Sequence, residues 1–169
     1  MEIFLGALTT IFGVIVGGVL QHFTSRRAID RQHQWERSRL VHEKLENIAQ
    51  TANEMGEGMK RLYSDAIISV ESGERYNPQK PLPFAKLELL LSFYAPELRP
   101  EYDQLLALRD EMGSTIATLI NGGVPKTKAE KQHINKKLLK ASFQSVRICD
   151  KIIGGASKLG RTRLYLNDE

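Results

Sequence analysis

The fold of this chain is decided by residues 41–66, which read VHEKLENIAQTANEMGEGMKRLYSDA. Apolar and small side chains recur in this stretch at alternating steps of four and three residues. That spacing places them in one stripe along a helix, as in a heptad repeat, and such a stripe must be buried against other helices. We call this stripe the seam; its residues are Val41, Leu45, Ile48, Ala52, Met55, Met59, Leu62 and Ala66.

The composition of the seam favours a bundle of several helices over a free-standing coiled coil. Its two alanines bury little area and its two methionines pack loosely. Gly56 and Gly58 lie in the same helix, and each costs about 1 kcal/mol relative to alanine. The pattern leaves open whether the helix pairs within one chain or between copies.

Proline and glycine residues divide the rest of the chain into three further predicted helices, and no stretch is convincing as a strand. Pro78, Pro81 and Pro83 mark a loop after the long helix. The three helices are expected over residues 83–95, 101–121 and 127–153. The expected fold class is therefore all-α, with an antiparallel bundle of about four helices.

The last of these helices has a well-marked start and an irregular end. Thr127 and Glu130 have the T-x-x-E spacing of a capping box. Gly154 and Gly155 are expected to interrupt the helix, because glycine is a poor helix former. Residues 158–169 are then expected to form a basic tail.

A second apolar run opens the chain. From Ile3 to Leu20 there is no charged residue, Asn, Gln or His. A helix of this length, at about 1.5 Å per residue, matches the roughly 30 Å hydrocarbon core of a bilayer. No Lys or Arg precedes the run, whereas Arg26, Arg27 and Arg31 follow it. This bias predicts a single-pass helix in the inner membrane, with the N-terminus outside and the bulk of the chain in the cytoplasm.

Two other interpretations of this run fit less well. A cleaved signal peptide needs a basic segment before the apolar stretch and a small-residue cleavage site after it. A buried helix of a soluble protein would have to be surrounded on every side. The expected organisation is a membrane anchor over residues 1–23, a basic juxtamembrane helical segment over 24–40, a cytoplasmic bundle over 41–157 and the tail.

Small residues share one face of the predicted anchor. Gly6, Thr10, Gly13 and Gly17 are spaced by four, three and four residues. Such a face lets two helices approach closely in lipid. The sequence therefore predicts a homo-oligomer assembled through this face.

The strongest surface signal lies in the predicted helix over residues 127–153. The net charge of +4 is concentrated in residues 113–169, which carry eleven Lys and Arg against four Asp and Glu. Five basic residues of this helix fall within an arc of about 100°, and Phe143 lies beside them. This basic face consists of Lys136, Lys137, Lys140, Arg147 and Lys151.

Three interpretations of the basic face remain open. It is a solvated surface, a site for an acidic protein or the anionic headgroups of a bilayer, or a site for nucleic acid. Nucleic acid is the least favoured partner, because the stripe has no recognised motif and few aromatic side chains for stacking.

Catalytic chemistry has little support in the sequence. The four histidines are scattered, and Glu130 with His133 forms only one half of a di-iron Glu-x-x-His pattern. Cys149, the one cysteine, lies on an apolar helix face. We expect no catalytic residue, no metal site and no cofactor.

These observations favour a membrane-anchored helical scaffold or adaptor that self-associates or docks a protein partner at the cytoplasmic face. One alternative is a membrane-perturbing effector or channel-forming oligomer. The other is a membrane tether that holds nucleic acid through the basic helix.

Overall fold

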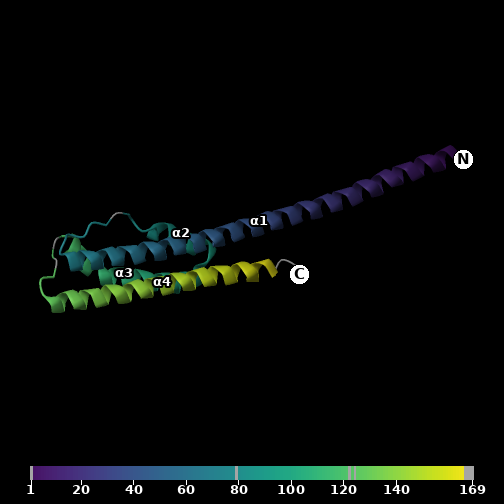
Figure 1. The fold of residues 1–169 in the computed structure, drawn as a ribbon. Coiled ribbons are helices and arrows are strands. Elements are labelled where there is room, and N and C mark those ends of the chain that lie inside the picture. The colour runs from purple at the N-terminus through teal and green to yellow at the C-terminus, as the bar shows by residue number, and fades with distance from the viewer. Residues whose placement is uncertain (1, 79, 122, 124, 166–169) are drawn as a thin grey trace. The chain divides into compact units, whose positions relative to one another are not determined.

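The structure, a computed structural model, describes residues 2–78, 80–121, 123 and 125–165; for residues 2–28, 30 and 163–165 it describes the backbone alone. The elements within these residues are all helices, so the all-α prediction is confirmed (Figure 1). They are α1 (Glu2–Ser72), α2 (Phe84–Tyr94), the 3₁₀ helix η1 (Pro96–Leu98), α3 (Arg99–Ile120) and α4 (Lys128–Tyr165).

The chain divides into two units, residues 1–40 and 41–169, and each is described by itself. The first unit contains the N-terminal part of α1, whose described side chains are exposed except for the half-buried Ser38. Arg31 is among the exposed residues. The guanidinium carbon of Arg39 lies 5.6 Å from the ring centroid of Trp35, the distance of a cation–π contact.

Within the described residues, every helix is too short or too polar to traverse a lipid bilayer. This finding overturns the predicted location in the inner membrane and the transmembrane part of the predicted fold. Between Arg31 and Glu46 of α1, charged side chains recur in every turn or two, and the side chains of the predicted anchor over residues 1–23 lie outside those described. The remaining residues of these predictions lie outside the described side chains: Gly6, Thr10, Gly13, Gly17, Arg26 and Arg27.

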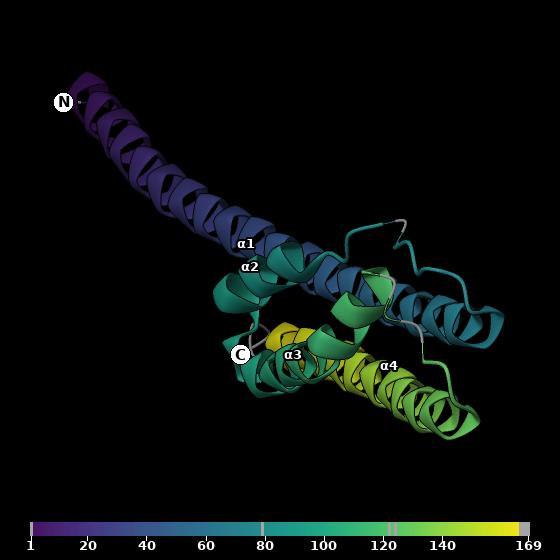
Figure 2. The ribbon, with the colours of Figure 1, turned by 90° about the vertical axis from the view of Figure 1, so that its left-hand side faces the viewer.

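In the second unit, α4 runs antiparallel to the second half of α1. Near the end of α1, the backbone carbonyl of Glu71 accepts a 3.1 Å hydrogen bond from the Lys131 ammonium, and the Glu71 carboxylate accepts one from the Asn135 amide. At the other end, Gly160 of α4 packs close to His42 and Leu45 of α1. α3 lies beside α4 (Figure 2).

The seam lies mostly inside this unit. Six of its eight residues are buried, whereas Val41 and Leu62 are half-buried. After Met59 the core position passes to Tyr63, which is only 1% exposed, because a helix of 3.6 residues per turn drifts away from a strict heptad. The partners of the seam include α4 of the same chain: a Cβ at Gly56 would lie 3.3 Å from the Cβ of Cys149.

The end of α4 differs from the prediction. The helix continues through Gly154 and Gly155 to Tyr165, so the expected tail is helical as far as the structure describes it. Packing overrides the weak helix propensity of glycine here. A Cβ at Gly155 would collide with the side chain of Leu98, and Ala156 and Gly160 are buried.

The start of α4 is as predicted. The Thr127 hydroxyl accepts a 3.2 Å hydrogen bond from the Glu130 N–H, and the Glu130 carboxylate accepts a 3.1 Å bond from the Thr127 N–H, so the capping box is confirmed. The backbone N–H and the hydroxyl of Thr127 lower the pKa of Glu130. Its stabilising contribution is therefore present above the pKa of the unfolded chain and is lost as pH falls through the lower pKa of the folded state.

The two adjacent glycines of α4 offer a matched test of this packing. Gly154→Ala should raise the free energy of unfolding by about 0.5–1 kcal/mol, because an added Cβ meets open space. Gly155→Ala has the same propensity gain but displaces Leu98, so it should be less stable than Gly154→Ala by at least about 1 kcal/mol. Urea unfolding measures both; equal stabilisation would contradict the close contact with η1.

The capping box gives a second prediction. Thr127→Ala should lower the free energy of unfolding by about 1 kcal/mol, because it removes the acceptor of the Glu130 N–H. Thr127→Ser keeps the hydroxyl and serves as the control. Thermal unfolding of the three proteins decides the matter, and an alanine variant as stable as the serine variant would count against the cap.

Candidate functional site

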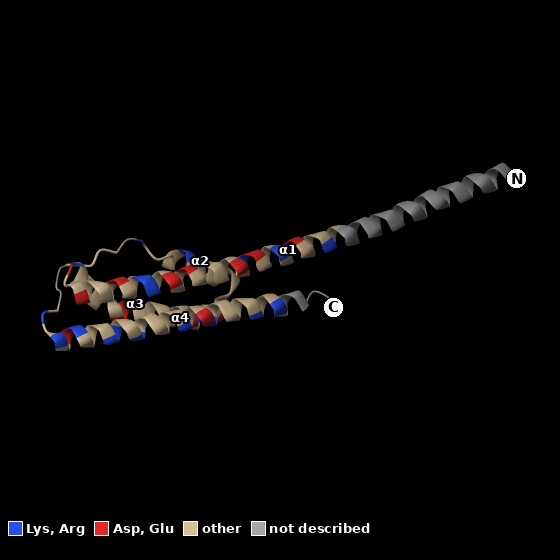
Figure 3. Cartoon of the chain, viewed as in Figure 1, with Lys and Arg blue, Asp and Glu red and all other residues tan. Residues whose placement is uncertain are grey.

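The predicted basic residues lie on the exposed side of α4. Lys136, Lys140, Arg147 and Lys151 follow one another at steps of four, seven and four residues, which keeps them on one side of the helix. Because α4 continues past the two glycines, Lys158 joins them. We call these five exposed residues the basic stripe. Lys and Arg recur along the length of α4 (Figure 3). Lys137 is also exposed and lies about 100° around the helix from Lys136.

The cations of the basic stripe make no ion pair within the part of the chain that the structure describes. On α3, by contrast, the Arg99 guanidinium contacts Glu88 at 2.9 Å and Asp103 at 3.0 Å. The sequence of α4 holds ten Lys and Arg against two Asp and Glu. Because these positive charges lie on one helix, they produce a positive potential that attracts acidic groups.

Two large apolar side chains are exposed next to the stripe. Leu139 is 51% exposed and Phe143, one turn further on, is 70% exposed. At 100° per residue, Phe143 lies within about 40° of Lys136 and Arg147 around the helix. Exposed apolar side chains that gather beside charged ones are typical of binding surfaces.

Sequence reasoning noticed Phe143 but missed Leu139. The signal was the adjacent pair Leu138-Leu139, because neighbouring residues on a helix point about 100° apart and only one can face the core. In the structure, Leu138 is fully buried and Leu139 faces outward.

A shallow groove borders the other side of the stripe, between α3 and α4. Its volume is about 490 Å³. Leu108 and Ile148 supply apolar lining, while Arg147 and Lys151 stand at its edge. Around the exposed side of α4, the apolar pair Leu139 and Phe143 comes first, the row of cations next and the groove last. We call Leu139, Phe143, the basic stripe and this groove the α4 surface.

The groups considered for catalysis have structural roles. Glu130 belongs to the capping box, and the described residues include no cluster of His, Cys, Asp or Glu that would hold a metal. Burial, and to a lesser degree Asp150, raise the pKa of the Cys149 thiol to about 12. A buried thiol with so high a pKa is a poor nucleophile.

Comparison of the chain with protein-family models, curated proteins and solved structures finds no match in any of the three. Function is therefore inferred from the geometry and the charge of the α4 surface.

The raised pKa of Cys149 predicts how stability depends on alkaline pH. The unfolded thiol loses its proton near pH 9.0, whereas the folded thiol keeps it until about 12. Its contribution is complete below the unfolded pKa and is lost as pH rises towards the folded one. Tyr63, with a pKa raised to about 12 mainly by burial, adds a similar loss that Cys149→Ala retains.

We expect the free energy of unfolding of the unmodified protein to fall more steeply above pH 9 than that of Cys149→Ala. Urea unfolding at a series of pH values measures both slopes. Parallel slopes would show that the thiol titrates normally in the folded state.

Proposed function

We propose that this protein is a helical adaptor that binds an acidic, amphipathic segment of a partner protein on the α4 surface. The observation that carries the proposal is the exposure of Leu139 and Phe143 beside a row of unpaired cations. A segment with apolar residues on one side and a row of carboxylates beside them complements this arrangement. The bundle serves as the rigid support that holds the surface in place.

The apolar pair and the cations contribute to binding in different ways. Burying a side chain such as phenylalanine contributes about 1.5–3 kcal/mol, so Phe143 is the expected centre of the binding energy. Cations around such a centre mainly speed association and select acidic partners. The proposal therefore predicts that loss of Phe143 weakens binding strongly, and that loss of the cations makes it less specific and less sensitive to salt.

Nucleic acid is a weaker candidate for the same surface. Nucleic acid binding depends mainly on cations that contact phosphates and on aromatic side chains that stack with bases. Leu139 has no use in such a contact, and Phe143 is the single aromatic residue of the α4 surface. An acidic protein segment employs both kinds of side chain, which favours a protein partner.

A photo-crosslinking derivative of phenylalanine at position 143, which keeps the aromatic ring, tests this proposal in cells that make the protein. Phe93 on α2 is the matched control position, because it is also phenylalanine and is 73% exposed against 70% for Phe143. We expect position 143 to form an adduct with an acidic protein segment, and position 93 not to form it. Replacing Lys136, Lys140, Arg147 and Lys151 with glutamine should lower the yield of the adduct and its sensitivity to salt.

Three results would count against the proposal. The same adducts from positions 143 and 93 would indicate nonspecific contact. An adduct that nuclease removes would assign the surface to nucleic acid. An adduct whose yield and salt dependence are unchanged by the fourfold glutamine substitution would show that the charges have no role.

A further inference from the structure

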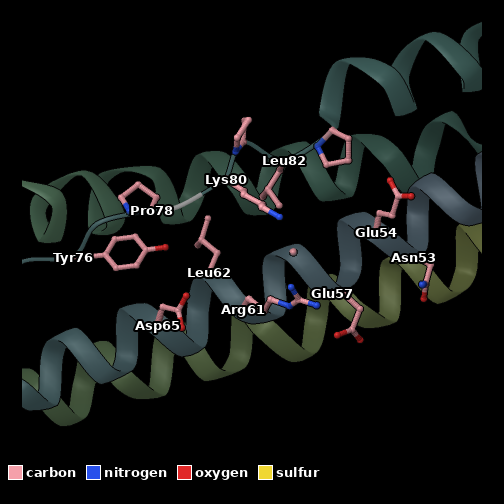
Figure 4. A pocket seen from close by; sticks show the side chains of 13 residues that line it. Asn53, Glu54, Glu57, Arg61, Leu62, Asp65, Tyr76, Pro78, Lys80 and Leu82 are labelled. Carbon is pink, nitrogen blue, oxygen red and sulfur yellow. The ribbon is translucent and has the colours of Figure 1, made fainter.

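A cavity of about 650 Å³ lies between α1 and the proline-containing loop that follows it (Figure 4). Its volume is within the range of sites for small ligands. It does not include any residue of the α4 surface. An inference about this cavity is therefore independent of the proposed adaptor function.

The loop wall of the cavity is fixed at both ends. Near its start, the Tyr76 N–H donates a 3.3 Å hydrogen bond to the Leu119 carbonyl, and the Arg75 guanidinium donates one to the Ile120 carbonyl. Near its end, Leu82 packs directly on Gly58, where an added Cβ would lie 2.5 Å from Leu82 Cδ2. Prolines in the loop restrict its backbone further, so this wall is largely formed before any ligand arrives.

Two cations face the cavity from opposite walls. Lys80 extends from the loop towards α1, and Arg61 lies along the α1 wall of the same cavity (Figure 4). Arg61 is four residues from both Glu57 and Asp65, the spacing at which ion pairs form along a helix. Among the described residues it pairs with neither, and Lys80 has no ion pair either.

One end of the cavity, beside the two cations, is lined by a carboxylate and a hydroxyl group. The side chain of Tyr76 is only 5% exposed, and its hydroxyl points into the cavity (Figure 4). This hydroxyl has no hydrogen-bond partner among the described residues. Burial and the nearby Asp65 carboxylate raise the pKa of Tyr76. Asp65 itself has no ion pair within the described residues, whereas the other two carboxylates are engaged elsewhere, Glu54 with Gln50 and Glu57 with Lys60.

The unpaired groups together define the chemistry of a ligand. Arg61 and Lys80 suit a carboxylate, and Asp65 with the Tyr76 hydroxyl suits an amino group. Arg61 and Asp65 are separated by about 6 Å along the helix, from four residues of about 1.5 Å each. The two termini of a dipeptide, whose Cα atoms alone are about 3.8 Å apart, span a similar distance.

The geometry points to a binding site for a small zwitterion of dipeptide size, with its carboxylate between Arg61 and Lys80 and its amino group at Asp65. The apolar side chains of such a ligand would lie against Leu62 and Leu82, which line the same cavity. A peptide embedded in a longer chain lacks one or both terminal charges, so the site selects short free peptides.

Leucyl-leucine and two blocked analogues test this assignment with the full-length protein. N-acetyl-leucyl-leucine lacks the cationic end, and leucyl-leucinamide lacks the anionic end. We expect leucyl-leucine to bind, as followed by NMR shifts of the Gly58 and Leu62 amides. Each analogue should bind about tenfold more weakly, because one charge-assisted hydrogen bond is worth roughly 1.4 kcal/mol or more.

Substitutions assign each end of the ligand to its residue. Arg61→Gln should reduce the preference for leucyl-leucine over its amide, because Lys80 alone then faces the carboxylate, and it should keep the preference over the acetylated form. Asp65→Asn should reduce the preference for leucyl-leucine over the acetylated form and keep the preference over the amide. Arg147→Gln on α4 is the control and should leave both preferences unchanged, and Arg61, Asp65 and Arg147 are all exposed, so these variants should fold.

Two outcomes would overturn the assignment. One is the absence of saturable shifts with millimolar leucyl-leucine in a protein that unfolds cooperatively. The other is equal binding of all three compounds, which would mean that the apolar walls alone retain them. Neither outcome bears on crosslinking at position 143, so this proposal and the adaptor proposal fail separately.

Discussion

The close antiparallel contact between the second half of α1 and α4 is the constraint on which the rest of the structure depends. At Gly56 the missing side chain lets Cys149 pack close to the backbone of α1. Hydrogen bonds from Lys131 and Asn135 to Glu71 fix the register at one end. Because α1 and α4 supply much of the core, α2, η1 and α3 pack against a surface that this pair has already defined.

This contact also explains the character of the outer face of α4. The side that faces α1 and α3 is occupied by buried residues such as Leu138, Ser145 and Ile152. Leu139 and Phe143 lie outside that arc, so their apolar surface stays in water beside the cations. Exposure of this kind costs solvation free energy. A partner that covers the two side chains would recover it, which is the physical basis of the adaptor proposal.

The loop after α1 illustrates how a second site arises from the same architecture. Helix α1 ends at Ser72, and the next residue, Gly73, has a φ of 79°, a left-handed conformation that glycine adopts without strain. The chain then returns along α1 and rests on Gly58 through Leu82. Between these two points the loop stands away from the helix, and polar side chains of both line the space that remains.

Sequence reasoning succeeded where the signal is local or periodic. The capping box of Thr127 and Glu130 involves groups three residues apart, so its spacing alone was sufficient. The spacing of the basic residues likewise indicated that they share one side of α4. The predicted end of α4 at Gly154 and Gly155 was wrong, because contacts with distant residues outweigh the local preference there. Leu98 and Gly155 are more than fifty positions apart in the sequence, and their contact accompanies the continuation of α4.

The predicted membrane location shows a different limit. It was drawn from an apolar run of sequence, and no helix among the described residues has the length and apolar character to cross a bilayer.

Composition and spacing by themselves determined that the chain is helical, where the loops lie and which helix carries the charge. Only the tertiary structure decided which of two adjacent leucines is buried, that Tyr63 replaces Leu62 in the core, and which glycines permit close packing. The reason is that periodicity fixes positions around one helix axis, whereas burial depends on which other helices approach that axis and from which side.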